Sequence, residues 1–160
     1  THRSYVWRKL KALGALYLQN SICILPSIEP VEETLRQLHA EIVNRNGTAI
    51  ILHVNLLNEE ERTQIIARFR RQMEDEYSEF IEECGEFHAE LTKERARHHL
   101  TYGELEENDV DLGKLRLWLP KLRVRDFFQV DTATKAAEAL ESCEADFSRF
   151  ESEVEEASKG

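Results

Sequence analysis

Residues 5–26 read YVWRKLKALGALYLQNSICILP, and this stretch joins a helical pattern to a strand pattern with no linker between them. Val6, Leu10 and Leu13 are spaced by four and three residues, so they share one face of a helix. Gly14 follows at the position where a glycine in the left-handed conformation commonly ends a helix. The beginning of the chain is therefore predicted to be a short amphipathic helix that stops at Gly14.

Two short apolar runs follow the glycine, residues 15–19 and 21–25, with only Asn20 between them. Such a short connection predicts that the two runs pair as an antiparallel hairpin. A second apolar pattern with helical spacing covers residues 29–46, and the β-branched run of residues 48–56 then predicts a buried strand.

The predicted order in residues 1–57 is helix, strand, strand, helix, strand. One more strand in front would complete the split βαβ repeat of a ferredoxin-like domain. We therefore expect an α+β protein whose first domain, residues 1–57, is ferredoxin-like and lacks its first strand. Because the sheet edges would otherwise stay open, we expect another segment of the polypeptide or a partner to supply that strand.

A helical extension, residues 58–160, is expected to pack on this domain. Apolar residues spaced by three or four predict one helix over residues 58–97 and another around residues 112–122, where Pro120 forces a kink or an end. A last helix is predicted to begin at Asp131. Helices with such long apolar stripes must bury them on one another, so we expect an antiparallel helical hairpin or bundle.

The charge of the chain is distributed unevenly. The net charge is −10, and residues 58–112 carry seven basic and seventeen acidic side chains. This excludes a protein that binds nucleic acid over its whole surface, because phosphate contact needs a continuous positive area. Two basic islands remain, Arg3, Arg8, Lys9 and Lys11 at the start, and Lys114, Arg116, Lys121, Arg123 and Arg125 before the last helix.

The three cysteines, Cys23, Cys84 and Cys143, are widely spaced and lie within apolar patterns. This is not the framework of a secreted disulfide domain, and it favours a reducing cytoplasm. No apolar run approaches the roughly twenty residues that span a bilayer, so no membrane contact is expected.

Four segments of the sequence together resemble the N-terminal domain of the chromate-resistance regulator family ChrB. They are Trp7-Arg8-Lys9-Leu10-Lys11-Ala12-Leu13-Gly14-Ala15, Leu18-Gln19-Asn20-Ser21-Ile22-Cys23-Ile24-Leu25-Pro26, Glu76-Tyr77-Ser78-Glu79-Phe80-Ile81-Glu82-Glu83-Cys84 and Arg125-Asp126-Phe127-Phe128. The resemblance extends in order over nearly the whole chain. The first half also resembles the ferredoxin-like domain shared by the PaaX repressors and the small CRISPR-associated adaptation nucleases.

The resemblance implies a cytoplasmic bacterial protein that represses a chromate-efflux operon and is relieved when chromate is sensed. The sequence departs from this pattern because it contains no recognisable helix-turn-helix. The acidic metal ligand of the nucleases lies on the leading strand that this chain lacks, so that residue cannot be assigned here. The nuclease function is therefore the weakest implication of the three.

The first basic island is a candidate DNA-binding site. Arg3, Arg8, Lys9 and Lys11 fall on a short predicted helix, and several cations on one exposed helix are what contact with the phosphate backbone requires. An ordinary solvated helix face is the alternative.

The second basic island is a candidate oxyanion site. Arg116, Lys121, Arg123 and Arg125 could bind chromate or sulfate, because guanidinium groups suit tetrahedral oxyanions. The alternative is that these cations form salt bridges to the acid-rich helix of residues 74–94.

Metal and catalytic sites are not predicted. Cys84 and His88 are four residues apart and could contribute to a metal site with Cys143, but two residues do not make one, and core packing is the simpler interpretation. The acidic run of residues 104–111 lacks the glycine and terminal glutamate of a calcium loop, so a solvated loop is expected. No nucleophile with a base and no phosphate-binding glycine loop is present, so we expect no cofactor and no enzyme activity.

Three functions are carried forward. The first is a non-enzymatic, ChrB-like regulatory or sensing domain that forms a homodimer and contacts DNA through its basic N-terminal helix. The second is a helical interaction or assembly module without DNA contact, which the net charge and the long apolar stripes favour. The third is a metal-dependent nuclease.

Overall fold

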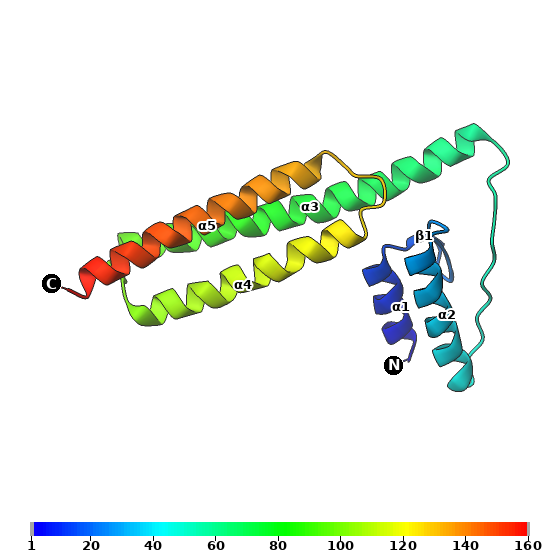
Figure 1. Ribbon diagram of the computed structural model, residues 1–160, viewed down its shortest axis with the longest axis horizontal. Helices are drawn as coiled ribbons and strands as arrows, with labels where there is room; N and C mark the ends of the chain where they lie inside the picture. Colours follow the sequence, from blue (N-terminus) through cyan, green and yellow to red (C-terminus); the bar gives the residue numbers. More distant parts are fainter. Residues whose placement is uncertain (1, 160) are drawn as a thin grey trace. The chain divides into compact units, whose positions relative to one another are not determined.

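The computed structural model describes residues 2–159, and Figure 1 shows their secondary structure. Its elements are α1 (His2–Leu13), β1 (Leu16–Gln19), β2 (Ile22–Ile24), α2 (Glu29–Asn44), α3 (Glu59–Ala96), α4 (Tyr102–Val124) and α5 (Thr132–Ala157). The chain divides into two compact units, Thr1–Arg70 and Arg71–Gly160. Helices and one small antiparallel sheet agree with the predicted α+β class. No helix in the described part of the chain is long and apolar enough to cross a membrane.

The first unit begins as the sequence predicts. Gly14 has φ 91°, and its N–H donates to the carbonyl of Lys11 at 3.0 Å. The N–H of Ala15 donates to the carbonyl of Leu10 at 3.0 Å, so two carbonyls of the last turn of α1 are satisfied. A β-carbon is disfavoured at this positive φ, which explains the glycine.

The hairpin is also confirmed. β1 and β2 pair antiparallel, with Leu16 opposite Ile24 and Tyr17 opposite Cys23, and the register shifts before Gln19. Val31 and Leu38 are the buried residues of α2. The buried apolar residues of the unit are Ala15, Leu16, Val31, Leu38 and Phe69.

The strand predicted over residues 48–56 is wrong, because the structure assigns this segment no secondary structure. Among the described residues the sheet consists of β1 and β2 alone, so the segment has no strand to exchange backbone hydrogen bonds with. Its apolar side chains are exposed instead of buried, as Ile50 at 84% and Leu52 at 73% illustrate. The ferredoxin-like fold predicted for residues 1–57 is therefore not confirmed.

The second unit is a bundle of long helices, as predicted. α4 runs antiparallel to both α3 and α5 (Figure 1). The α3 helix begins after Asn58, whose side chain accepts a hydrogen bond from the N–H of Glu61 at 2.9 Å. The buried core of the bundle consists of Met73, Tyr77, Phe80, Cys84, Phe87, Leu91, Leu112, Leu115, Leu119, Leu122, Val130, Ala136, Cys143, Phe147, Phe150 and Val154.

One expectation about α4 is corrected. The acidic residues 104–111 lie in the helix and not in a loop, because Thr101 caps it by accepting a hydrogen bond from the N–H of Glu104 at 3.2 Å. Asn108 is buried and donates to the carbonyl of Glu104 at 2.8 Å. Pro120, predicted to force a kink or an end, does not end the helix, which continues to Val124.

Tyr77 is the most polar of the large buried side chains in the bundle. Its hydroxyl donates to Oδ2 of Asp126 at 3.2 Å, and this carboxylate also accepts the N–H of Val130. Burial, followed by the charge and the hydrogen bond of Asp126, raises the pKa of Tyr77 to about 12. The folded state therefore favours the protonated phenol.

This shift predicts a loss of stability in alkali. Tyrosine in the unfolded chain ionises near pH ~10, so the stabilisation is complete below that pH and is lost as the pH rises toward the value in the folded protein. Urea unfolding from neutral pH to about pH 12 should show a steeper fall in unfolding free energy for the wild type than for Tyr77→Phe. Tyr102→Phe, at an exposed tyrosine, should follow the wild type. Identical pH profiles for wild type and Tyr77→Phe would contradict the prediction.

Candidate functional site

The first basic island lies on α1, and its four side chains are exposed. The ion pairs formed by the described residues involve other cations, so the charges of Arg3, Arg8, Lys9 and Lys11 are not neutralised by a carboxylate within the described chain. At 100° per residue, Arg3, Lys11 and Arg8 fall within about 140° of the helix circumference. These three uncompensated cations make a compact positive surface, and Lys9 lies about 100° further around the helix than Arg8.

Tyr5 joins this surface to α2. Nζ of Lys9 lies 5.6 Å from the centre of the Tyr5 ring, and Cζ of Arg45 lies 5.5 Å from it. The Tyr5 hydroxyl donates to Oε2 of Glu41 at 2.8 Å. An Nη1 of Arg45 lies 2.8 Å from Nδ1 of His2. Arg45 is thus a further cation of the surface that sequence spacing could not identify, since it comes from a different helix.

Trp7 adds an aromatic group between the cations. Its side chain is 49% exposed, and Nζ of Lys11 lies 5.3 Å from the centre of a Trp7 ring. Arg3, Trp7 and Lys11 are spaced by four, so they follow one another along the same face of α1. An exposed indole between cations can pack on sugars or bases while the cations meet phosphates.

The second basic island is not gathered in one place. Nε and Nη2 of Arg116 donate to the two carboxylate oxygens of Glu144, each at 2.6 Å. Arg125 donates through Nε to Oε2 of Glu76 at 2.9 Å, and both of these side chains are largely buried. The pairing of Arg125 with Glu76 matches the predicted alternative of salt bridges to the helix of residues 74–94.

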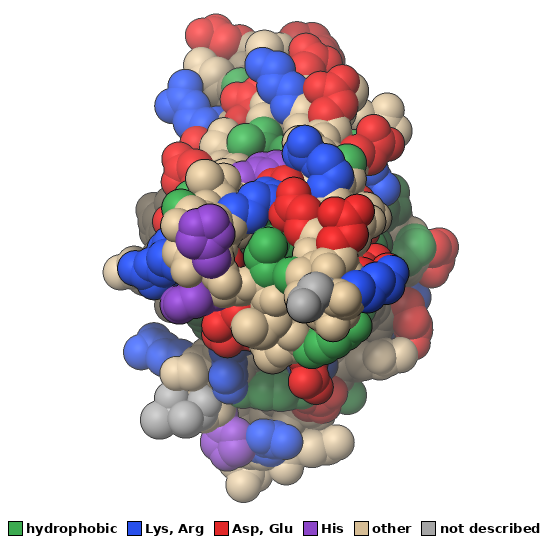
Figure 2. All heavy atoms as spheres, turned by 90° about the vertical axis from the view of Figure 1, so that its left-hand side faces the viewer, with side chains coloured by type: hydrophobic (Ala, Val, Ile, Leu, Met, Phe, Trp, Pro, Cys, Tyr) green, Lys and Arg blue, Asp and Glu red, His purple; other side chains and the backbone are tan. Residues whose placement is uncertain are grey.

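Lys121 and Arg123 are exposed near the end of α4. Two residues apart on a helix, they point about 160° away from each other and cannot close on one small anion. With Arg116 and Arg125 already paired, the oxyanion site stays a prediction without geometric support. On the face drawn in Figure 2, basic and acidic side chains are interspersed, so this face carries no broad positive area.

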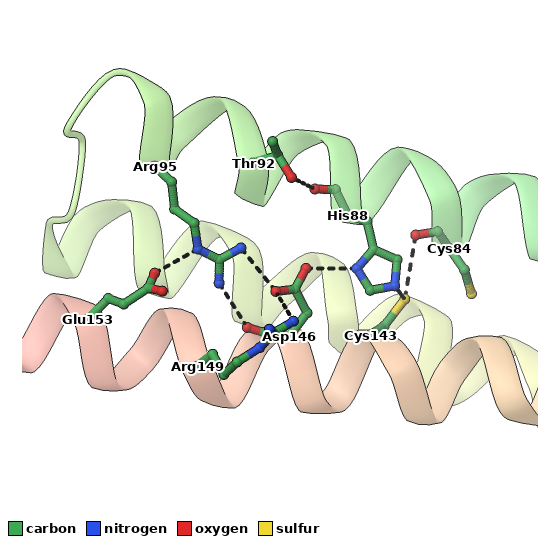
Figure 3. A network of polar contacts seen from close by, with 8 residues as sticks. All are labelled: Cys84, His88, Thr92, Arg95, Cys143, Asp146, Arg149 and Glu153. Carbon is green, nitrogen blue, oxygen red and sulfur yellow. Dashed lines mark hydrogen bonds and ion pairs between the residues drawn. The ribbon is translucent and has the colours of Figure 1, made fainter.

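A polar network lies between α3 and α5 inside the bundle (Figure 3). Asp146, whose side chain is 6% exposed, accepts from Nδ1 of His88 at 2.7 Å, Nη1 of Arg95 at 2.9 Å and Nη2 of Arg149 at 3.1 Å. Nε of Arg95 also donates to Oε2 of Glu153 at 2.6 Å. Desolvation of Asp146 by burial is outweighed by the bonds and charges of His88 and Arg95, which lower its pKa.

Cys143 extends this network to the apolar core. Its Sγ lies 3.6 Å from Nε2 of His88 and donates to the carbonyl of Cys84 at 3.5 Å. Cysteine, imidazole and carboxylate thus stand in the order of a nucleophilic triad. However, Cys143 is fully buried, and hydrogen bonding with the Cys84 thiol together with burial raises the pKa of Cys143. A protonated thiol without access to solvent is a structural group, so this arrangement supports core packing and not catalysis.

One group of side chains has the composition of a metal site. Ligand atoms of Glu94, His99 and Glu104 lie within 4.8 Å of one another. Among residues 2–159, no other group of three metal-ligating side chains has its ligand atoms this close together. Glu94 is buried, and its Oε2 lies 3.0 Å from Nδ1 of His99. His98, with φ 56°, turns the chain so that His99 faces α3. Sequence analysis missed the group because this turn is not visible in the spacing.

The family of the chain follows from a comparison with family models. The model described as Protein ChrB, N-terminal, matches residues 3–160. The chain belongs to this family. ChrB is a regulator-type family related to chromate resistance and not a known enzyme family. No curated protein and no solved structure matches the chain.

The family assignment agrees with the chemistry of the two units. In this ChrB N-terminal domain, the buried network has no exposed nucleophile, and four exposed cations lie on α1. The α1 surface therefore consists of Arg3, Arg8, Lys9 and Lys11 with Arg45 added by the structure.

Proposed function

We propose that this ChrB-type domain acts in the cytoplasm as a non-enzymatic transcriptional regulator and contacts DNA through α1. The observation that carries the proposal is that Arg3, Arg8, Lys9 and Lys11 are exposed and that the ion pairs of the described residues do not involve them. The chain as a whole carries a net charge of −10, so phosphate would be attracted to this helix and repelled by the acidic segments.

Trp7 and Arg45 support the same function. Trp7 is half exposed between cations of α1, and Arg45 adds a positive group beside Tyr5. An aromatic ring among cations is suited to nucleic acid, where sugars and bases lie between the phosphates. The contact surface is small, so a single copy would bind weakly and a homodimer would bind two adjacent sites.

Salt dependence of binding provides the test. The probe is the DNA duplex that lies upstream of the gene encoding this chain, compared with a scrambled duplex. If the four α1 cations each contact a phosphate, a fourfold rise in salt should weaken binding about 100-fold. Arg8→Glu combined with Lys11→Glu should reduce that dependence to about tenfold. Fluorescence anisotropy at several salt concentrations measures both quantities.

The matched control reverses two exposed lysines elsewhere, Lys135→Glu and Lys159→Glu. This control has the same change in net charge as the α1 variant, so it separates a local contact from general repulsion. Equal weakening by both variants, or binding that ignores salt, would refute contact through α1. In that case the domain would be an interaction module without DNA contact.

A further inference from the structure

The solvent-facing side of α4 carries an apolar stripe that has no partner in the described structure. Val110, Leu117 and Val124 are 57%, 68% and 81% exposed. They are seven residues apart, so they lie almost in line along the helix. The opposite side of α4 packs in the bundle through Leu112 and Leu119. We call these three side chains the α4 stripe.

Charged residues flank the stripe in an ordered pattern. At the same seven-residue spacing, one flank carries Glu107, Lys114 and Lys121, and the other carries Asp109, Arg116 and Arg123. Each flank is therefore acidic in the first half of the helix and basic in the second half. Within the chain, Lys114 pairs with Asp111, and Arg116 pairs with Glu144 and Asp109; all five side chains are at least 39% exposed. Exposed pairs of this kind exchange partners at little cost.

We propose that the α4 stripe docks on the α4 stripe of a second copy of this chain, with the two helices antiparallel. In antiparallel pairing each flank meets the same flank of the other helix. Glu107 of one copy then faces the basic half of the second copy, and Asp109 does so on the other flank. In parallel pairing the basic halves would lie side by side and repel each other. The charge pattern therefore favours one partner and one orientation.

Gly113 lies at the midpoint of α4 and is consistent with this arrangement. With a two-fold axis near Gly113, the acidic half of each helix lies opposite the basic half of the other. A β-carbon on Gly113 would meet nothing within 4 Å, so the surface is open there. The absence of a side chain allows two helix backbones to approach closely at the crossing point.

This interface goes beyond the proposed function and does not depend on DNA contact. Because one helix face makes a small interface, a dissociation constant in the micromolar range is expected. Sedimentation velocity of the whole chain should show a monomer–dimer equilibrium across that range. Leu117→Glu should weaken dimerisation at least ~30-fold, as expected for a central apolar contact. Lys135→Glu, an exposed charge change on α5, should leave dimerisation unchanged.

A charge exchange tests the flanks. Glu107→Lys with Asp109→Lys makes both flanks fully basic, and Lys121→Glu with Arg123→Glu makes the last position of each flank acidic. Each double variant alone should dimerise less than the wild type, and an equimolar mixture of the two should restore a dimer. Loss of dimerisation in each variant without recovery in the mixture would overturn the role of the flanks.

The orientation is tested by single spin labels in a Cys23→Ser background. Antiparallel helices that cross near Gly113 place labels at Lys114→Cys close together and labels at Gly103→Cys about 30 Å apart, from the 1.5 Å rise per residue. Short distances at both positions would show parallel pairing and overturn the proposal. A monomer at all concentrations would also overturn it. Neither result bears on the DNA test, which uses α1.

Discussion

Replacement of Asp146 by alanine should lower the free energy of unfolding of the helical unit by about 3–5 kcal/mol. The carboxylate is 6% exposed and binds His88, Arg95 and Arg149 at 2.7, 2.9 and 3.1 Å. Its removal leaves the Arg95 guanidinium, which is itself only 26% exposed, with Glu153 as its remaining carboxylate partner. Removal of one partner from a buried ion-pair network leaves the donors that it accepted from without that partner, so the loss is large.

The pH dependence of this effect follows from the sign of the pKa shift. The bonds and charges of His88 and Arg95 outweigh the effect of burial and lower the pKa of Asp146 in the folded protein. Its stabilisation is therefore complete above the unfolded value of about 3.9 and is lost as the pH falls through the lower folded value. The difference between wild type and Asp146→Ala should be constant near neutral pH and shrink in stronger acid.

Urea unfolding followed by the fluorescence of Trp118, in a Trp7→Phe background, measures this difference. Asp111→Ala is the matched control, because Asp111 is 50% exposed and pairs with an exposed lysine. Such a surface pair contributes at most about 1 kcal/mol. If Asp146→Ala costs no more than Asp111→Ala, the buried network does not stabilise the bundle.

Phe80→Ala should destabilise the same unit by about 3–5 kcal/mol through a different mechanism. Phe80 is fully buried and packs edge-on against Trp118 of α4, with 5.3 Å between the ring centroids. Truncation removes the aromatic contact and leaves a cavity between two helices that can close it only partly. Unlike the effect of Asp146, this loss should not change between neutral and acidic pH.

Leu117→Ala is the control for Phe80→Ala, because it removes an aliphatic side chain that is 68% exposed. At sub-micromolar protein concentration, where the proposed dimer is dissociated, it should change stability by less than about 0.5 kcal/mol. Phe80→Leu should cost less than Phe80→Ala, since it leaves a smaller cavity. Equal stability of Phe80→Ala and Leu117→Ala would mean that the contact of α3 with α4 does not hold the bundle together.

Local patterns in the sequence were sufficient to predict most helices. The glycine that ends α1 and the hairpin around Asn20 were both predicted, because each depends on residues only a few positions apart. The acidic run of α4 was misjudged as a loop. The many charged residues made the helical spacing of the leucines hard to see in the sequence. The cap at Thr101 was also not recognised.

The candidate sites were predictable only in part. The cations of α1 could be found because they are adjacent in sequence, whereas Arg45 comes to Tyr5 through the packing of α2 on α1. The partners Glu144 of Arg116 and Asp146 of His88 lie 28 and 58 residues away from them. No spacing rule connects such distant positions, so these ion pairs appear only when the helices are packed.

The sequence by itself determined the helices, the hairpin and the α1 cations, because periodicity and charge are local properties of the chain. Only the tertiary structure decided that residues 48–56 do not form a strand. An extended apolar run becomes a strand only when a neighbouring strand exchanges backbone hydrogen bonds with it. The tertiary structure also decided which side of α4 is buried and which side carries Val110, Leu117 and Val124 into solvent. Both outcomes depend on which other segment packs against the one in question, and such contacts exist only in the folded protein.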